Sequence, residues 1–266
     1  MNTEEVTEGL NLSTKINFLD LKTKLFFSIS NNPSTRGSKF YNKFFKKKNY
    51  IYLPLKIENK ITFKEIIIFL RKKIINFGGA SISMPYKEEI LKYVDKKDFT
   101  VKISKNANTI ILNKNKLISY NTDYLAAKKI LNNIKYKNVI LIGVGALSKT
   151  FLSLLKKKNV YVANRSEKRI SGLKNLFIKF KKFNSSEVDK IKNFVIINAT
   201  PSTNKMKIYN YINFNKARLI VDCVISAKLT YLKKIAKKFS INYIDGNSFY
   251  YLQRSFQKKI YLNEKL

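Results

Sequence analysis

The chain has 266 residues, of which 45% are hydrophobic, and it contains one cysteine and no histidine. This length and composition are sufficient for one large or two small globular domains. The single cysteine, Cys223, excludes an internal disulfide, and the lack of histidine excludes a Cys/His zinc site, so no metal site is predicted. No apolar run could span a bilayer, and the first residues lack the apolar core of a secretion signal. We therefore expect a cytoplasmic protein without a membrane partner.

The formal net charge of +36 raises the question of nucleic-acid binding. Lysines occur in nearly every segment, on the polar faces or at the C-terminal ends of apolar helical patterns, as in NKFFKKKNY and LLKKKNV. Lysines at such positions stay solvated and complement the helix dipole. We therefore predict a general surface charge and no specific nucleic-acid partner.

In the first half of the chain, a polar extension (1–22) precedes an alternation of apolar runs and amphipathic stretches. The pattern predicts strands at 23–30, 50–57 and 79–84 and helices at 38–48 and 63–77, with Pro85 opening a further helix. Two more strands, 108–113 and 116–120, are predicted to pair through a turn at Lys114–Asn115, before a helix over 122–134.

The second half of the chain repeats this alternation. Strands are predicted at 138–143, 160–165, 194–200, 218–225 and 241–245, and helices at 146–157, 168–177, 230–238 and 247–262. Val/Ile-rich strands separated by helices are typical of parallel sheets that are covered on both faces. The sequence therefore predicts an α/β protein with two α/β domains and a boundary within 123–137.

A glycine-rich turn follows the apolar strand NVILIG. Gly143 and Gly145 lie between this strand and the helix that begins at Ala146, the context of a dinucleotide-binding turn. The first glycine allows the tight turn, the second lets a pyrophosphate approach the backbone, and the helix amides receive its charge. The third position of the GxGxxG pattern is Ser148, so on this motif alone a purely architectural turn remains an alternative.

The next strand ends in VYVANRSEKR, which bears on the choice of cofactor. A site for NAD would have Asp or Glu at this strand end to bind the ribose hydroxyls. The chain instead carries Asn164, Arg165, Ser166 and Arg169. Guanidinium groups suit a 2′-phosphate, so NADP is the predicted cofactor, and solvated arginines at a helix start are the alternative.

Several segments together resemble the shikimate dehydrogenase family, in order from about Lys24 onward. GASISMPYKEE is similar to the family's N-V-T-x-P-x-K, NANTI to A-V-N-T, and YNTDYLA to N-T-D-x-x-G. GVGALSKT is similar to G-A-G-G-A-x-x-A, ANRSEKR to N-R-T-x-x-R, INATPS to I-N-A-T-P, and DGNSFYYLQ to D-G-x-x-M-L-x-x-Q. The specificity lies in the collinearity of these segments.

The resemblance implies roles for particular residues. Lys87 and Asp123 correspond to the family's catalytic pair. Taken singly, Lys87 is better explained as a solvated lysine at a helix start and Asp123 as a helix N-cap, but together with the other segments the catalytic pair is favoured. The implied substrate-binding residues are Thr35, Ser38, Ser83, Asn108 and Gln253. The implied cofactor-binding residues are Gly143, Gly145, Ala146, Asn164, Arg165, Ser166, Arg169 and Thr200.

The chain departs from the family pattern at several of these positions. The family's paired serines near the N-terminus correspond, with Tyr41 and Asn42 as the anchor, to Thr35 and Gly37, and Ser38 replaces a proline. Ser81 and Ser83 stand in place of Asn and Thr, and Ile225 in place of a frequent Tyr. The resemblance therefore implies the fold more firmly than it implies substrate affinity and turnover.

The resemblance also implies an organisation and an activity. A substrate-binding domain over 23–123 is expected to be completed by the helix 246–266, and a Rossmann-type NADP-binding domain is expected over 124–245. The implied activity is that of an oxidoreductase of aromatic amino acid biosynthesis, the reversible NADPH-dependent reduction of 3-dehydroshikimate to shikimate, in a monomer or a homodimer. The alternatives are a quinate/shikimate dehydrogenase with relaxed cofactor use, and a catalytically impaired basic Rossmann protein that binds nucleic acid.

Overall fold

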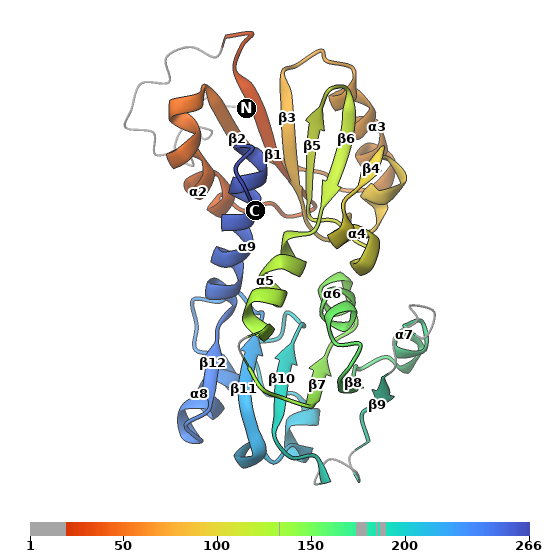
Figure 1. Ribbon diagram of the computed structural model, residues 1–266, viewed down its shortest axis with the longest axis vertical. Helices are drawn as coiled ribbons and strands as arrows, with labels where there is room; N and C mark the ends of the chain where they lie inside the picture. Colours follow the sequence, from red (N-terminus) through yellow and green to blue (C-terminus); the bar gives the residue numbers. More distant parts are fainter. Residues whose placement is uncertain (1–19, 133, 174–179, 185, 187–189) are drawn as a thin grey trace. The chain divides into compact units, whose positions relative to one another are not determined.

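The computed structural model describes residues 20–132, 134–173, 180–184, 186 and 190–266 (Figure 1). Residues 1–19 of the predicted N-terminal extension and residues 174–177 of the predicted helix 168–177 lie outside this part. The described chain divides into two compact units. The first comprises residues up to Lys102, Asn106–Asn121 and Gln257–Leu266, and the second comprises Ile103–Lys105 and Thr122–Phe256.

The first unit is built on a six-stranded sheet in the order β2-β1-β3-β5-β6-β4 (Figure 1). Its strands are β1 (Lys24–Ser30), β2 (Tyr50–Lys56), β3 (Phe77–Ile82), β4 (Lys96–Lys97), β5 (Thr109–Asn113) and β6 (Lys116–Tyr120). β1 pairs in parallel with β2 and β3, whereas β5 runs antiparallel to β3 and β6. The predicted strand pair is confirmed, with Lys114 and Asn115 at positive φ values of 44° and 65° in its turn.

Two hydrophobic clusters lie on the two faces of this sheet. The helix α2 (Arg36–Phe45) and the last turn of α9 (Gly246–Tyr261) contribute to an aromatic cluster of Phe26, Tyr41, Phe45, Tyr52 and Tyr261. The helix α3 (Lys60–Arg71) contributes Phe63, Ile67 and Leu70 to the other cluster. The short helix α4 (Phe99–Ser104) precedes β5.

The predicted helix after Pro85 is wrong. Residues 84–88 form turns, and a 3-10 helix, η2 (Glu89–Lys92), follows. Tyr86 accounts for the difference, because its ring stacks on Phe63 with centroids 4.3 Å apart and its hydroxyl donates to the carbonyl oxygen of Ile57 at 2.8 Å. Proline favours the first turn of a helix, but here the tertiary contacts of Tyr86 outweigh this local preference and determine the backbone conformation.

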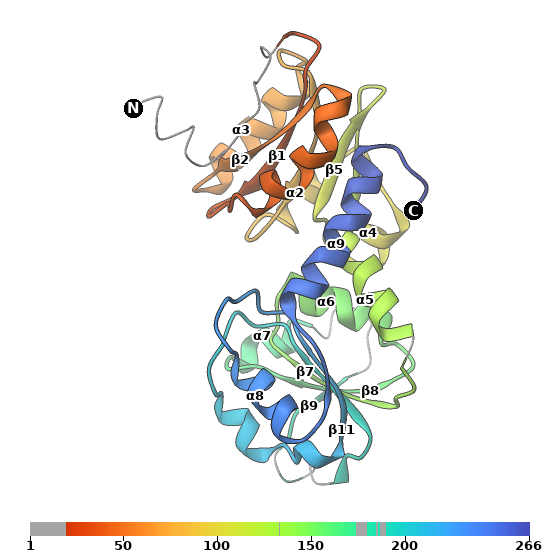
Figure 2. The ribbon, with the colours of Figure 1, turned by 90° about the vertical axis from the view of Figure 1, so that its left-hand side faces the viewer.

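The second unit contains a six-stranded parallel sheet in the order β12-β11-β10-β7-β8-β9 (Figure 1; turned by 90° in Figure 2). Its strands are β7 (Asn138–Ile142), β8 (Asn159–Ala163), β9 (Lys181–Lys182), β10 (Phe194–Asn198), β11 (Ala217–Asp222) and β12 (Asn242–Ile244). The central strand β10 is buried along its whole length, as expected for a parallel sheet that is covered on both faces.

Helices and hydrophobic clusters cover both faces of this second sheet. The helices α5 (Thr122–Asn132) and α6 (Ala146–Leu154), which lie side by side, form one cluster with Phe249 of α9. The helix α8 (Tyr231–Lys238) and the 3-10 helices η5 (Lys207–Tyr211) and η6 (Phe214–Lys216) contribute to the other. The short helix α7 (Glu167–Ser171) follows β8. The predicted fold class, two α/β domains with parallel-rich sheets, is confirmed.

Candidate functional site

Lys87 lies in the turn that follows β3 in the first unit, and the backbone on both sides of it is anchored. Tyr86 is buried and, as described above, holds the turn against Phe63. The backbone carbonyl of Lys87 accepts a hydrogen bond from the N–H of Ala107 at 2.8 Å. The position of the Lys87 backbone is therefore set by the core rather than by a helix.

Asn108 follows Ala107 directly and is 4% exposed. Its backbone N–H donates to the carbonyl oxygen of Tyr120 at 3.2 Å, and its own carbonyl oxygen accepts from the N–H of Ile82 at 2.8 Å. These bonds join Asn108 to the ends of β3 and β6. The structure thus brings the segments that carry Lys87 and Asn108 together, one backbone hydrogen bond apart.

Three predicted substrate-binding residues lie at chain turns of the same unit. Thr35 is the N-cap residue of α2 and is exposed, and Ser83 is exposed immediately after β3. Ser38, in the first turn of α2, is buried, and its hydroxyl oxygen has no hydrogen-bond partner within the described part of the chain. A buried hydroxyl without a hydrogen-bond partner costs free energy, and this sets Ser38 apart from the exposed Thr35 and Ser83.

Asp123 and Gln253 belong to the second unit. Asp123 is buried in the first turn of α5, where the helix dipole favours a negative charge. Gln253, on α9, donates through Nε2 to the hydroxyl of Thr122 at 2.7 Å. Gln253 is thus hydrogen-bonded to the residue that directly precedes Asp123 in the chain.

The glycine turn has the geometry that its sequence predicts. Gly143 has a φ of +103°, and a Cβ atom there would lie 2.9 Å from Cγ2 of Thr200. A Cβ at Gly145 would meet nothing within 4 Å, so there is open space at the N-terminus of α6. Open space beside a glycine backbone and a helix N-terminus fit a pyrophosphate. Thr200 and Ala146 therefore lie in the same neighbourhood as the two glycines.

The end of β8 carries the residues that are expected to distinguish NADP from NAD. Asn164 donates through Nδ2 to the carbonyl oxygen of Ser166 at 3.0 Å, which shapes the loop. The side chains of Arg165 and Arg169 are exposed on this loop and on the helix that follows. Two exposed guanidinium groups at this strand end fit a phosphate ester.

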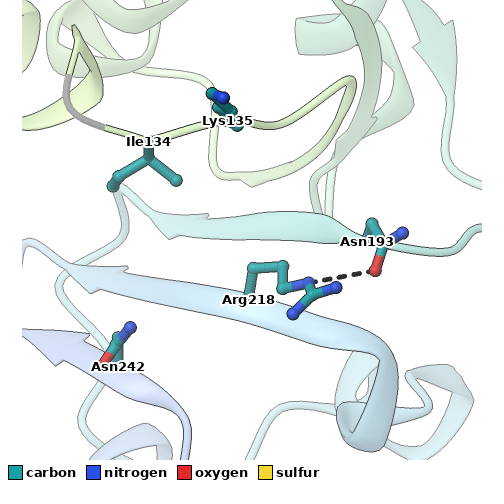
Figure 3. A pocket seen from close by; sticks show the side chains of 5 residues that line it. All are labelled: Ile134, Lys135, Asn193, Arg218 and Asn242. Carbon is teal, nitrogen blue, oxygen red and sulfur yellow. Dashed lines mark hydrogen bonds between the residues drawn. The ribbon is translucent and has the colours of Figure 1, made fainter.

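A pocket of about 450 Å³ lies at the amino ends of strands of the second sheet, opposite to the glycine turn, which follows the carboxyl end of β7 (Figure 3). It is lined by Ile134, Lys135, Asn193, Arg218 and Asn242, and Nε of Arg218 donates to Oδ1 of Asn193 at 3.0 Å. The residues Asn193, Arg218 and Asn242 stand at the amino ends of β10, β11 and β12. Active sites of open α/β sheets form at the carboxyl ends of strands, so we assign this pocket no catalytic role.

Sequence reasoning missed Thr109, Tyr41 and Gln257, which are buried and hydrogen-bonded around Asn108. A signal was available, because Gln257 follows Gln253 by one helical turn on the amphipathic helix α9. Within the described residues, no helix is long and apolar enough to cross a membrane and no cluster of three or more acidic, Cys or His residues could hold a metal ion.

Comparison with known proteins identifies relatives over both units. The family described as shikimate dehydrogenase substrate binding domain matches residues 34–110, and the family shikimate / quinate 5-dehydrogenase matches residues 125–225. The shikimate dehydrogenase (NADP(+)) of Saccharolobus islandicus is 32% identical over 198 residues, covering 71% of this chain and 71% of its own. That of Methanococcus vannielii is 29% identical over 218 residues, covering 74% of this chain and 76% of its own.

A solved structure extends the likeness to the whole fold. The crystal structure of a shikimate dehydrogenase in complex with NADP+ has a TM-score of 0.76, is 25% identical, and covers 93% of each chain. The matches of both units, in the order of the sequence motifs, agree with the geometry of the glycine turn and of the Lys87 turn. The chain belongs to the shikimate dehydrogenase family.

Proposed function

We propose that this chain catalyses the reversible NADPH-dependent reduction of 3-dehydroshikimate to shikimate. The observation that carries the proposal is the anchored turn in which Lys87 is joined to the segment of Asn108 by a backbone hydrogen bond of 2.8 Å to Ala107. An amine and an amide, presented from fixed backbone at the edge of a sheet, suit the recognition and protonation of a hydroxylated cyclic ketone. The relatives named above act on shikimate and NADP, which supports the same assignment.

In this proposal Lys87 is the acid of ketone reduction and the base of the reverse reaction. NADPH, when bound, supplies the hydride. The ammonium group of Lys87 donates a proton to the carbonyl oxygen, and in the reverse direction its amine removes the proton from the hydroxyl. The chain contains no histidine, so the residue type that usually transfers protons near neutral pH is absent. Asp123, which the family resemblance pairs with Lys87, is proposed to assist this proton transfer.

The remaining substrate contacts are proposed for residues that can donate hydrogen bonds. The carboxylate of the substrate would accept from Thr35 and from the Ser38 hydroxyl, the buried group that has no partner in the described structure. The ring hydroxyls would be bound by Ser83, Asn108 and Gln253. Each of these side chains can both donate and accept hydrogen bonds, as binding of a polyhydroxylated anion requires.

The cofactor is proposed to bind to the second unit. The backbone at Gly143, Gly145 and Ala146 would receive the pyrophosphate, where the open space at Gly145 and the N-terminus of α6 support this assignment. Asn164, Arg165, Ser166 and Arg169 would bind the 2′-phosphate, and Thr200, whose side chain lies beside Gly143, would contribute to the same cofactor site. We place the reaction in the cytoplasm, in a monomer or a homodimer.

A single assay tests the proposal. The purified protein is offered NADP with shikimate or with quinate, each in excess, and cofactor reduction is followed by absorbance; NAD replaces NADP in a parallel series. We expect reduction with shikimate and NADP. Comparable rates with quinate or NAD would favour the relaxed quinate/shikimate enzyme. No reduction with either substrate, together with sequence-selective DNA binding that persists at physiological salt, would favour the nucleic-acid alternative, because binding through phosphates alone collapses as salt rises.

A further inference from the structure

A chain of four buried hydrogen-bonding groups leads from α2 to Asn108 in the first unit. The hydroxyl of Tyr41 donates to Oε1 of Gln257. Nε2 of Gln257 donates to the hydroxyl of Thr109 at 2.7 Å and to the backbone carbonyl oxygen of Asn108 at 3.0 Å. The hydroxyl of Thr109 donates to Oδ1 of Asn108 at 2.8 Å. We call this series the Tyr41–Asn108 relay.

The direction of each bond in the relay is determined by chemistry. The backbone carbonyl oxygen of Asn108 only accepts, so the atom of Gln257 that faces it must be the amide nitrogen. The oxygen of the Gln257 amide consequently faces Tyr41 and accepts a hydrogen bond from its hydroxyl. The hydroxyl of Thr109 accepts a hydrogen bond from Nε2 of Gln257, so its own O–H is available to donate to Asn108.

The last bond of the relay orients the side-chain amide of Asn108. Because Thr109 donates, the amide oxygen of Asn108 must face it, and the amide nitrogen takes the other side of the group. The four side chains are between 0% and 4% exposed, so bulk water does not compete for these bonds. The amide of Asn108 is consequently presented in one of its two orientations.

We propose that Gln257, acting through Thr109, is a positioning residue that fixes the Asn108 amide so that its nitrogen donates to a substrate hydroxyl. The inference rests on the proposed function, which assigns Asn108 to the substrate. The two glutamines of α9 would then have different roles. Gln253 contacts Thr122 in the second unit, whereas Gln257, one turn later, contacts residues of the first unit.

The test uses two variants that interrupt the relay at different places. Gln257→Glu keeps the size of the side chain but replaces the donor by an acceptor, so the Thr109 hydroxyl turns toward the new carboxylate and Asn108 loses its donor. Thr109→Val keeps the shape and removes the hydroxyl without burying a charge. Each variant should raise KM for shikimate roughly ten-fold, the effect of misplacing one hydrogen bond, with a smaller change in kcat. The double variant should be little worse than either single variant, because both break one series.

Tyr261→Phe is the matched control. It removes the 2.9 Å hydrogen bond between Tyr261 and Ser81, which also ties the last turn of α9 to the first sheet, but lies outside the relay. All variants are compared by thermal unfolding, by KM for NADP, and by the Kd of shikimate without cofactor. We expect the control to lose stability while its shikimate KM and Kd stay within about two-fold of the wild type.

The outcomes separate this inference from the proposed function. Wild-type binding and oxidation of shikimate, with weaker shikimate binding in both relay variants and an unchanged KM for NADP, would support it. Unchanged shikimate Kd and KM in folded Thr109→Val and Gln257→Glu, or an equal loss in Tyr261→Phe, would overturn the relay and leave the proposed function intact. A wild-type protein that neither binds nor oxidises shikimate would overturn both.

Discussion

The carboxylate of Asp222 at the end of β11 offers a test of how the second unit holds Thr200, a residue proposed to contribute to the cofactor site. Three donors converge on this group: Nδ2 of Asn198 at 2.9 Å, the hydroxyl of Thr230 at 2.7 Å and the hydroxyl of Tyr243 at 2.8 Å. Asp222 and Asn198 are each 1% exposed. Oδ1 of Asn198 in turn accepts from the backbone N–H and the hydroxyl of Thr200. The segment that carries Thr200 is thus connected to a buried carboxylate.

Asp222→Asn removes the charge and changes little in shape. The single amide oxygen of the new side chain can still accept from Thr230 and Tyr243, but its amide nitrogen then opposes the amide nitrogen of Asn198. One charged hydrogen bond is lost, at about 1.5–3 kcal/mol, and two become neutral, so we expect the free energy of unfolding to fall by roughly 3 kcal/mol. If Asn198 rotates to relieve the conflict, it releases Thr200, and KM for NADP should rise by about ten-fold.

The assay combines urea unfolding, followed by circular dichroism, with NADP kinetics. Tyr243→Phe is the control, because it removes one of the three donors and leaves the bond between Asn198 and Asp222 intact. It should cost about 1 kcal/mol and leave KM for NADP unchanged. A loss below about 1 kcal/mol in Asp222→Asn, with normal NADP kinetics, would refute the argument that this network supports the segment that carries Thr200.

In steady-state kinetics, Arg165→Ser should raise KM for NADP by about ten-fold and leave KM for NAD within about two-fold. The control Arg218→Ser, an exposed arginine at the amino end of β11, should change neither value. Equal effects of Arg165→Ser on both cofactors would show that Arg165 does not bind the 2′-phosphate. Gly143→Ala should lower the free energy of unfolding, measured in urea, by about 2 kcal/mol and weaken NADP binding. The reason is that the φ of +103° disfavours a side chain and that the new Cβ would contact Thr200. Unchanged stability and NADP binding would contradict this prediction. The N–H of Leu117 and then the guanidinium of Arg71 hold the pKa of Asp95 below its usual value, so their stabilisation is present above the unfolded-state pKa and is lost as pH falls through the lower folded-state pKa. Arg71 and Asp95 are about one third exposed, and Arg71 also donates to the carbonyl oxygen of Tyr93 at 2.7 Å, a bond that acid leaves intact. Urea unfolding of Arg71→Met should therefore show a loss that is about 0.5 kcal/mol larger at neutral pH than below the folded-state pKa. An equal loss at both pH values would be evidence against a contribution of the ion pair.

Much of the fold could be predicted from local sequence patterns because the elements are strongly marked. The turn at Lys114–Asn115 was predictable because it lies between two short runs of β-type residues, and both residues have positive φ values in the structure. The buried strand β10 was predictable from its apolar residues, and the dinucleotide turn from the spacing of Gly143 and Gly145. In each case the determining interactions lie within a few residues along the chain.

The wrong or missing predictions concern residues whose conformation depends on contacts with residues far away in the sequence. The stacking of Tyr86 on Phe63 replaces a helix by a turn, and no local pattern encodes that contact. The relay to Asn108 joins residues separated by more than a hundred positions, because Gln257 reaches back from the last helix. A sequence motif indicated Asn108 but gave no indication of what orients its amide. Periodicity predicts which face of a helix is buried and does not identify its partners.

The central claim is that Lys87 transfers the proton while the second unit binds NADP. Its most direct test is the steady-state turnover of Lys87→Met, which keeps most of the apolar stem and removes the ammonium, measured beside Lys64→Met, an exposed lysine on α3. We predict that kcat with shikimate and NADP falls by about 10²–10⁴-fold in Lys87→Met, the range for a positioned acid or base, and stays normal in Lys64→Met, while the Kd for NADP is unchanged in both. Near-normal turnover in a folded Lys87→Met protein would contradict the claim and leave Lys87 as a solvated side chain on a structural turn.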